Sequence, residues 1–382
     1  MAQYDALVIG AGFAGATVAR RLAENGKQVL VLEQRGHTGG NAYDCLDEAG
    51  VLIHKYGPHI FHTQDKAVFD FLSRFTAWRD YRHRVVANVS GQLMPVPFNL
   101  TSLEIAFEGR AEELERKLVA AYGREKKVTI LELRQNPDPQ IRELAEYVYE
   151  NIFKTYTMKQ WGQTPEEIDP ATTARVPVFL SRDDGYFQDA YQGMPDRGYS
   201  ALFDAMLEHP NIHVRLNTPA SALLTLTQVG TTLVEGEVFH GPVVYTGPVD
   251  ALFENRFGRL PYRTLDFVFE THEVEWYQTH GTVNYTVDQP FTRITEFKHL
   301  TGQAISKRTT IVKEYSRAYT GEPGEIPYYA IINPDNKALY GKYAALAGEY
   351  PNLHLLGRLA EYQYYNMDAI VKRALELADQ LV

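Results

Sequence analysis

The chain opens with short apolar runs and one amphipathic stretch, separated by glycine-rich turns. Residues 7–9 form an apolar run typical of a strand that is buried on both faces of a parallel sheet. A helical pattern follows from 13 to 25, Gly26 ends it, and a second apolar run covers 29–32. The pattern predicts a strand, a tight turn, a helix and a second strand.

A helical region is predicted for residues 95–162. Pro95 and Pro97 mark its beginning, because proline fits neither a helix interior nor a central strand. Its longest helix begins at Asp138 and Pro139 and keeps an apolar face at helical spacing as far as Tyr156. A proline-rich segment, 162–179, follows, and we interpret it as a loop that closes over a site.

The turn after the first strand carries three glycines, Gly10, Gly12 and Gly15. In a dinucleotide site the first glycine allows the turn, the second admits a pyrophosphate, and the third lets the helix pack close to the strand. Glu33 ends the second strand, where an acid binds a ribose hydroxyl and repels a 2′-phosphate. The motif predicts a dinucleotide site.

FAD is the dinucleotide that the next segment favours. Gly39 and Gly40 form a glycine pair after the Glu33 strand, where NAD-dependent dehydrogenases usually continue into a helix. His59 and His62 follow a Gly-Pro turn, and we expect contact with the flavin ring rather than a metal, for which further ligands are missing from the pattern. The predicted cofactor-binding residues are Gly10, Gly12, Phe13, Gly15, Glu33, Gln34, Gly40, Asn41, His59, Ile60, Arg358 and Met367.

The fold class predicted from these patterns is α/β. Beyond about residue 175, short β-branched and aromatic runs predict an antiparallel or mixed sheet that holds the substrate. We expect a discontinuous Rossmann-like FAD-binding domain (1–94 with about 200–250 and 315–382), a helical domain (95–162) and the substrate sheet (163–199 with about 255–314). The helix near the C-terminus is expected to point its N-terminus at the flavin.

Composition restricts the partners. The 382 residues carry a formal net charge of −10, which argues against nucleic acid and anionic membranes, so arginines must hold any anionic ligand locally. One cysteine, Cys45, excludes a disulfide framework or a redox pair. No apolar run reaches the roughly 18 residues of a membrane span, and we expect a soluble cytoplasmic protein.

Several longer motifs resemble those of bacterial UDP-galactopyranose mutases over nearly the whole chain. They are GAGFAG, GGNAYD, YGPHIFHT, YTMKQWG, ARVPVF, YTGPVD, FTRITEFKH and GRLAEYQYYNM. The resemblance implies an isomerase that interconverts UDP-galactopyranose and UDP-galactofuranose without net redox change. It implies that N5 of reduced FAD attacks the anomeric carbon and forms a covalent adduct. It also implies an electron donor such as NAD(P)H, a homo-oligomer, and galactofuranose for a cell-wall or surface glycan.

The resemblance also assigns roles to residues of this chain. Arg175 and Arg293 match the two arginines that hold the diphosphate. We interpret His62 as the histidine near the flavin ring that tunes N5. Asn366 stands where many relatives have Asp. The implied substrate-binding residues are Phe153, Tyr156, Thr157, Trp161, Arg175, Tyr186, Arg293, Tyr329, Tyr364 and Asn366.

Two other functions fit the nucleotide motif. A flavin oxidoreductase of the amine-oxidase or desaturase type would need an apolar tunnel instead of arginines that face one pocket. A non-enzymatic FAD or NAD sensor would turn over no UDP-sugar even with reduced flavin. The aromatic residues near the predicted pocket favour the mutase.

Overall fold

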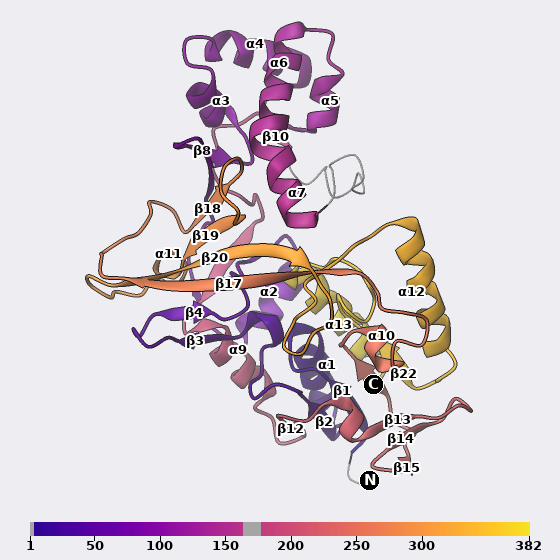
Figure 1. Cartoon of the computed structure of the whole chain (residues 1–382). Helices are drawn as coiled ribbons and strands as arrows, with labels where there is room; N and C mark the ends of the chain where they lie inside the picture. The colour runs from indigo at the N-terminus through magenta and orange to yellow at the C-terminus, as the bar shows by residue number, and fades with distance from the viewer. Residues whose placement is uncertain (1–3, 163–176) are drawn as a thin grey trace.

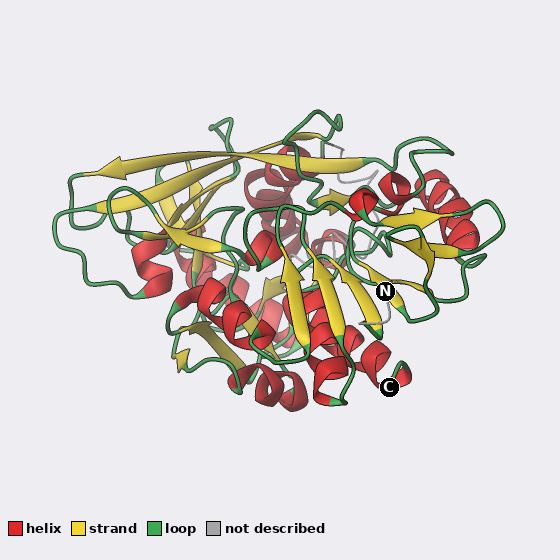
Figure 2. Cartoon of the chain, turned by 90° about the horizontal axis from the view of Figure 1, so that it is seen from below, coloured by secondary structure: helices red, strands yellow, loops and turns green. Residues whose placement is uncertain are grey.

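The computed structural model describes residues 4–162 and 177–382. A five-stranded sheet has the order β12 (Ile212–Arg215), β2 (Val29–Leu32), β1 (Ala6–Ile9), β16 (Val243–Tyr245) and β22 (Leu353–Leu355), and all of its strand pairs are parallel. Helix α1 (Phe13–Glu24) connects β1 to β2, which confirms the predicted strand, helix and strand. The strands point toward the long strands of a second sheet (Figure 2).

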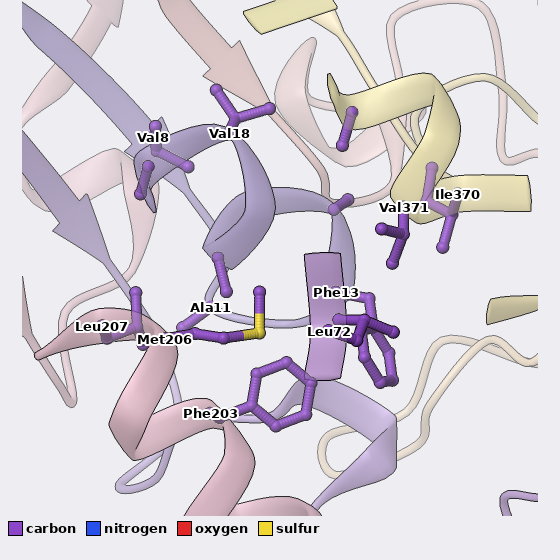
Figure 3. Close-up of a cluster of buried hydrophobic side chains, with 14 of the residues drawn as sticks. Val8, Ala11, Phe13, Val18, Leu72, Phe203, Met206, Leu207, Ile370 and Val371 are labelled. Carbon is purple, nitrogen blue, oxygen red and sulfur yellow. The ribbon is translucent and has the colours of Figure 1, made fainter. Parts of the chain in front are cut away.

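The two faces of the parallel sheet are covered differently. On one face, Val8 packs with side chains of α1, α2 (Lys66–Ser73), α9 (Gly198–Leu207) and α13 (Met367–Gln380), as Figure 3 shows. On the other face, Leu7 and Ile9 pack with Leu224 and Val234 of a small sheet formed by β13 (Leu224–Leu226), β14 (Thr232–Val234) and β15 (Glu237–Val238). Alternate residues of β1 therefore enter opposite cores, as expected for a strand buried on both faces.

The second large sheet has seven strands and is mixed, as the fold class predicts. Its order is β21 (Tyr329–Ala330), β17 (Tyr262–His272), β20 (Thr309–Ala318), β19 (Arg293–Glu296), β18 (Thr282–Tyr285), β7 (Val85–Val89) and β8 (Gln92–Val96). Strand β18 runs parallel to β7, and all other neighbours are antiparallel. The predicted limit after residue 94 falls inside β8, an edge strand that accommodates Pro95.

The helical part lies at one end of the molecule, beyond β17 and β20 (Figure 1). It contains α3 (Leu100–Ala106), α4 (Ala111–Tyr122), α5 (Ile130–Arg134), α6 (Pro139–Val148), a π-helical turn (Tyr149–Lys154) and α7 (Thr155–Trp161). Asp138 caps α6 by accepting a hydrogen bond from the Gln140 amide, which confirms the predicted helix start. The π-helical turn is not evident from the apolar spacing.

Helix α7 is fixed to the seven-stranded sheet by hydrogen bonds near its end. The Ser316 hydroxyl donates to the Gln160 carbonyl at 2.7 Å, and Lys159 donates to the Tyr285 carbonyl at 2.9 Å. Because α7 follows α6 through the π-helical turn, these bonds also hold the helical part against β18 and β20.

The remaining elements connect these parts. They are β3 (Asp44–Leu46), β4 (Leu52–His54), β5 (Phe61–Thr63), β6 (Trp78–Arg79), β9 (Lys127–Val128), β10 (Val178–Phe179), β11 (Tyr191–Pro195), α10 (Val249–Leu252), α11 (Phe297–Thr301), α12 (Pro334–Ala347) and short 3-10 turns at Gly40–Ala42 and Ala220–Ala222. Within the described part of the chain, no helix has the length and apolar character needed to cross a membrane.

Candidate active site

A cavity of about 770 Å³ lies between the carboxyl ends of the parallel strands and the seven-stranded sheet. Its lining includes Ile9, Glu33 and Tyr245 at the ends of β1, β2 and β16, and Leu265 and Arg293 on the opposing sheet. Open parallel sheets bind ligands at this edge. The cavity is continuous, so a cofactor at one end and a substrate at the other could meet inside it.

One positive φ and two close approaches around the glycine turn explain why glycine is needed there. Gly10 has a φ of +101°, and a Cβ on Gly15 would lie 1.9 Å from the Gly10 carbonyl oxygen. A Cβ on Gly40 would lie 3.0 Å from the Gly12 Cα. The start of α1 and the Gly39–Gly40 loop thus face each other across bare backbone, which leaves room for a pyrophosphate at the helix N-terminus.

Glu33 and Arg35 form the polar end of this cradle. The Glu33 carboxylate is 5% exposed and accepts hydrogen bonds from the Ala11 and Arg35 amides, each at 2.9 Å. The Arg35 side chain donates to Asn41 at 2.9 Å, and its buried Nη1 has no partner among the described residues. Both side chains line the cavity, so the cradle offers an acceptor for a ribose hydroxyl and an unused donor. These residues fit an adenine dinucleotide.

The structure brings most of the predicted cofactor-binding residues together. Gly15 does not line the cavity and acts through the close packing of α1. Arg358 donates to the Tyr365 carbonyl at 2.6 Å, and Met367 begins α13, whose N-terminal end therefore reaches the cavity. The lining includes Gly10, Gly12, Phe13, Glu33, Gln34, Gly40, Asn41, His59, Ile60, Arg358 and Met367.

Arg293 is the cation at the other end of the cavity. Its Nε donates to the Glu314 carboxylate at 2.6 Å across the β19–β20 pair, and its side chain remains 26% exposed while that of Glu314 is 1% exposed. Burial lowers the pKa of Arg293, but Glu314 and nearby tyrosines raise it more, so the net shift is upward. Its two terminal nitrogens have no hydrogen-bond partner within residues 4–162 and 177–382, and they can bind an anion.

Tyrosine side chains surround this arginine. Tyr156, Tyr186, Tyr329 and Tyr364 line the same cavity, together with Asn366 at the N-terminal end of α13. Burial raises the pKa of Tyr329 to about 12, although the positive charge of Arg293 opposes the shift. Burial likewise raises the pKa values of Tyr156 and Tyr186. Hydroxyl groups with raised pKa values stay protonated at neutral pH and can donate hydrogen bonds.

Four predicted substrate-binding residues differ from this group. Phe153 is 4% exposed and packs in the core of the helical part, and Thr157 is 6% exposed and does not line the cavity. Trp161 ends α7, but its side chain is outside the description. Arg175 and most of the predicted closing loop lie outside the described residues. The motif resemblance assigned Phe153 and Thr157 to the substrate site, but it does not show which way each side chain points.

Two of the predicted site residues that line the cavity are histidines, His59 and His62. The His62 Nδ1 lies 2.7 Å from the Asp189 carboxylate, and its ring stacks on Phe187 with centroids 3.5 Å apart. The His59 Nδ1 lies 2.9 Å from the Gly57 carbonyl, and burial lowers its pKa to about 3, so the ring is neutral. Among the described residues, no cluster of three or more His, Cys, Asp or Glu side chains could hold a metal.

The sequence predictions missed several residues that line the cavity. His83 is 4% exposed, and burial lowers its pKa to about 3. Thr282 and Asn284 project from β18 beside Arg293, and their buried side-chain oxygens lack partners among the described residues. The alternation of polar and apolar residues in 282–284 is a signal that could have identified these two, because it places both on one face of a strand. Nothing in the pattern around His83 marks it.

The fold and this site define a Rossmann-like dinucleotide-binding protein with a mixed sheet over the cofactor cradle. Residues 8–75 match the NAD(P)-binding Rossmann-like domain family. Residues 151–364 match the family described as UDP-galactopyranose mutase. The chain belongs to the UDP-galactopyranose mutase family. Mutases of this family are isomerases, and the chain is therefore an isomerase.

Relatives over the full length support this membership. The chain is 37% identical to UDP-galactopyranose mutase of Mycoplasma pneumoniae, over 100% of this chain and 96% of the relative. It is 37% identical to the probable UDP-galactopyranose mutase of Klebsiella pneumoniae (98% and 94%) and to dTDP-fucopyranose mutase of Escherichia coli (97% and 97%).

Solved structures show the same fold at lower identity. A reduced UDP-galactopyranose mutase matches with a TM-score of 0.72 at 18% identity, covering 99% of this chain and 93% of the other. A putrescine oxidase matches with a TM-score of 0.59 at 14% identity, covering 99% of both chains. The fold is therefore shared with a putrescine oxidase, and the family match and the sequence relatives distinguish this chain from it.

Proposed function

We propose that this protein interconverts UDP-galactopyranose and UDP-galactofuranose and that its cofactor is FAD in the reduced state. The observation that carries the proposal is the continuous cavity, which joins the glycine cradle to Arg293 and its tyrosines. An oxidase of amines or hydrocarbons would not need Arg293, whose two terminal nitrogens are available to an anion beside the buried tyrosine hydroxyl groups. A passive sensor would not need the cofactor and a second ligand in one cavity.

Reduced FAD, when bound, supplies a nucleophilic N5 for attack on the anomeric carbon of the sugar. The chain's own residues have three tasks around that event. Arg293 binds the diphosphate and offsets the charge that develops as the sugar–phosphate bond breaks. Tyr186, Tyr329 and Tyr364 donate hydrogen bonds to phosphate or sugar oxygens and hold the nucleotide near the sugar. The side chains that line the cavity exclude water from the sugar while its bond to the phosphate is broken.

The polar atoms of β18 complete the sugar end. The Thr282 hydroxyl and the Asn284 amide oxygen are buried without partners in the described chain, and each can bind a sugar hydroxyl. His62 lies on β5 and also lines the cavity, and we assign it the role of adjusting flavin N5 through a hydrogen bond. Asn366 also lines the cavity and gives a neutral contact at a position where many relatives have Asp.

The proposal extends to the setting of the enzyme. A flavin that works only when reduced needs an electron donor, and a nicotinamide nucleotide such as NAD(P)H is the donor that we propose. We infer a homo-oligomer in the cytoplasm that supplies galactofuranose for a cell-wall or surface glycan. These inferences rest on the motif resemblance.

The test is anaerobic incubation of the FAD-loaded protein with UDP-galactofuranose, with and without dithionite, followed by chromatography of the sugar nucleotides. We expect UDP-galactopyranose only after reduction. A parallel incubation with dTDP-fucofuranose is needed, because a dTDP-fucopyranose mutase is as similar to this chain as the UDP-galactopyranose mutases are. No conversion of UDP-galactofuranose in either state would refute the proposal, and conversion of the dTDP-sugar alone would reassign the substrate.

A further inference from the structure

His62 has one ring nitrogen engaged and one directed elsewhere. Its Nδ1 lies 2.7 Å from Oδ2 of Asp189, while Nε2 has no hydrogen-bond partner among the described residues. The side chain is 13% exposed and lines the large cavity. A carboxylate can only accept hydrogen bonds, so Nδ1 must carry the proton in this contact. In the neutral ring, Nε2 then presents a lone pair.

The contact is held rigidly from both sides. The His62 and Phe187 rings are stacked, with 3.5 Å between centroids and 12° between planes. Asp189 lies in the loop between Phe187 and β11, and β11 pairs with β5 so that Gln192 lies opposite His62. The ring therefore cannot turn without losing the stacking on Phe187 and the contact with Asp189.

The loop that carries Asp189 is fixed by two glutamines. The Gln192 side chain donates to the Phe187 and Asp189 carbonyls at 3.2 and 2.9 Å. The Gln64 side chain donates to the Gln188 carbonyl at 3.2 Å and accepts from the Ala190 amide at 3.3 Å. Gln64 directly follows β5 and Gln192 lies in β11, so the pairing of these two strands places the Asp189 carboxylate against His62.

We propose that Asp189 is a positioning residue, which fixes His62 in the Nδ1-protonated tautomer so that Nε2 accepts the N5 hydrogen of the reduced flavin. This proposal rests on the proposed function, because it assumes the flavin ring beside His62. Reduced flavin carries a hydrogen on N5, whereas oxidised flavin has a lone pair there. An acceptor at Nε2 therefore stabilises the reduced cofactor, which is the form that the proposed reaction requires.

The variant Asp189→Asn tests the idea, since an amide can donate to Nδ1 and force the opposite tautomer. In serine proteases the same exchange leaves the geometry intact and costs about 10⁴ in kcat through the wrong tautomer. We expect the reduction equilibrium of the bound flavin to shift about tenfold toward the oxidised form, a fall of about 30 mV for a two-electron couple. Removing a negative charge alone would raise the potential, so the sign distinguishes the two explanations.

One further measurement and a matched control keep the test independent of turnover. Nitrogen-15 spectra of histidine-labelled FAD-loaded protein, with the His62 signal assigned through His62→Gln, should show Nδ1 protonated in the unaltered protein and Nε2 protonated in Asp189→Asn. Asp184→Asn is the matched control, because Asp184 lies in the same loop region, does not line the cavity and binds Asn99 instead. The control should change neither the potential nor the spectrum.

The outcomes separate this proposal from the proposed function. An unchanged or raised potential in Asp189→Asn, or a His62 signal with Nε2 protonated in the unaltered protein, would overturn the role of Asp189 even if the mutase reaction proceeds. If Asp189→Asn folds poorly, Asp189→Ala gives the spectroscopic readout, because both tautomers of His62 should be populated without the carboxylate, and a ring that stays protonated only on Nδ1 would overturn the proposal. Absence of mutase activity in the unaltered protein would refute the proposed function and leave the tautomer measurement intact.

Discussion

Arg293 and Glu314 give a prediction in which stability and activity separate. Replacing Arg293 by methionine leaves a carboxylate that is 1% exposed without its ion-pair partner. Breaking a buried ion pair costs about 3–5 kcal/mol, because the remaining charge stays desolvated. The Arg293 side chain is 26% exposed, so water reaches the pair and we expect the lower value, about 3 kcal/mol.

The corresponding change in melting temperature can be worked out from the chain length. Unfolding entropy is about 2.1 cal/mol/K per residue, which for 382 residues gives about 0.8 kcal/mol/K when the chain unfolds as one unit. A loss of about 3 kcal/mol then lowers the Tm of Arg293→Met by about 4 °C. Adding Glu314→Gln removes the orphaned charge, and the double variant should recover most of this loss.

Activity should not recover with stability. Removing one preorganised charge donor from a transition state typically lowers kcat by about 10²–10³. We expect this loss in Arg293→Met and equally in the double variant, because neither can neutralise the diphosphate. The assays are thermal unfolding of the FAD-loaded protein and anaerobic conversion of UDP-galactofuranose after dithionite. Recovery of activity in the double variant would show that Arg293 acts only through Glu314, and an unchanged Tm in Arg293→Met would contradict the buried pair.

Three further predictions concern the cradle, the buried histidines and the sugar end. Gly15→Ala places a Cβ 1.9 Å from the Gly10 carbonyl oxygen, so α1 must move. The purified variant should carry at least about tenfold less FAD per chain, measured by absorbance. Full flavin content would contradict the packing argument. Burial lowers the pKa of His54 to about 4 and that of His83 to about 3, from 6.5. Between about pH 6.5 and 4 only the unfolded chain binds these protons, so the free energy of unfolding should fall by about 1.4 kcal/mol per pH unit for each histidine as the pH is lowered. His54→Gln should reduce the measured slope in thermal unfolding by about 1.4 kcal/mol per pH unit, and an unchanged slope would refute it. Thr282→Val deletes a buried hydroxyl without a described partner, so it should stabilise the ligand-free protein by about 1 kcal/mol. The same variant should raise KM for the sugar nucleotide. A loss of stability with an unchanged KM would exclude a sugar contact.

The sequence alone determined those features that depend only on interactions between residues close together in the chain. The glycine turn, α1 and Glu33 follow from sterics and hydrogen bonding within about thirty residues, and the start of α6 follows from Asp138 and the proline after it. The longer motifs also identified the family, because the residues that bind one ligand recur at fixed positions along a related chain. These features need no knowledge of distant contacts.

The tertiary structure alone decided which distant segments meet. Nothing in the pattern of 85–96 shows that this hairpin joins β18, since strand pairing is chosen by packing rather than by propensity. Periodicity likewise assigned Phe153 to an apolar face without showing that this face enters the helical core rather than the cavity. The contact between His62 and Asp189 joins residues 127 positions apart, and only the pairing of β5 with β11 brings them within hydrogen-bond distance. Spacing along the chain fixes the side on which a residue lies, but the choice of partner depends on long-range packing.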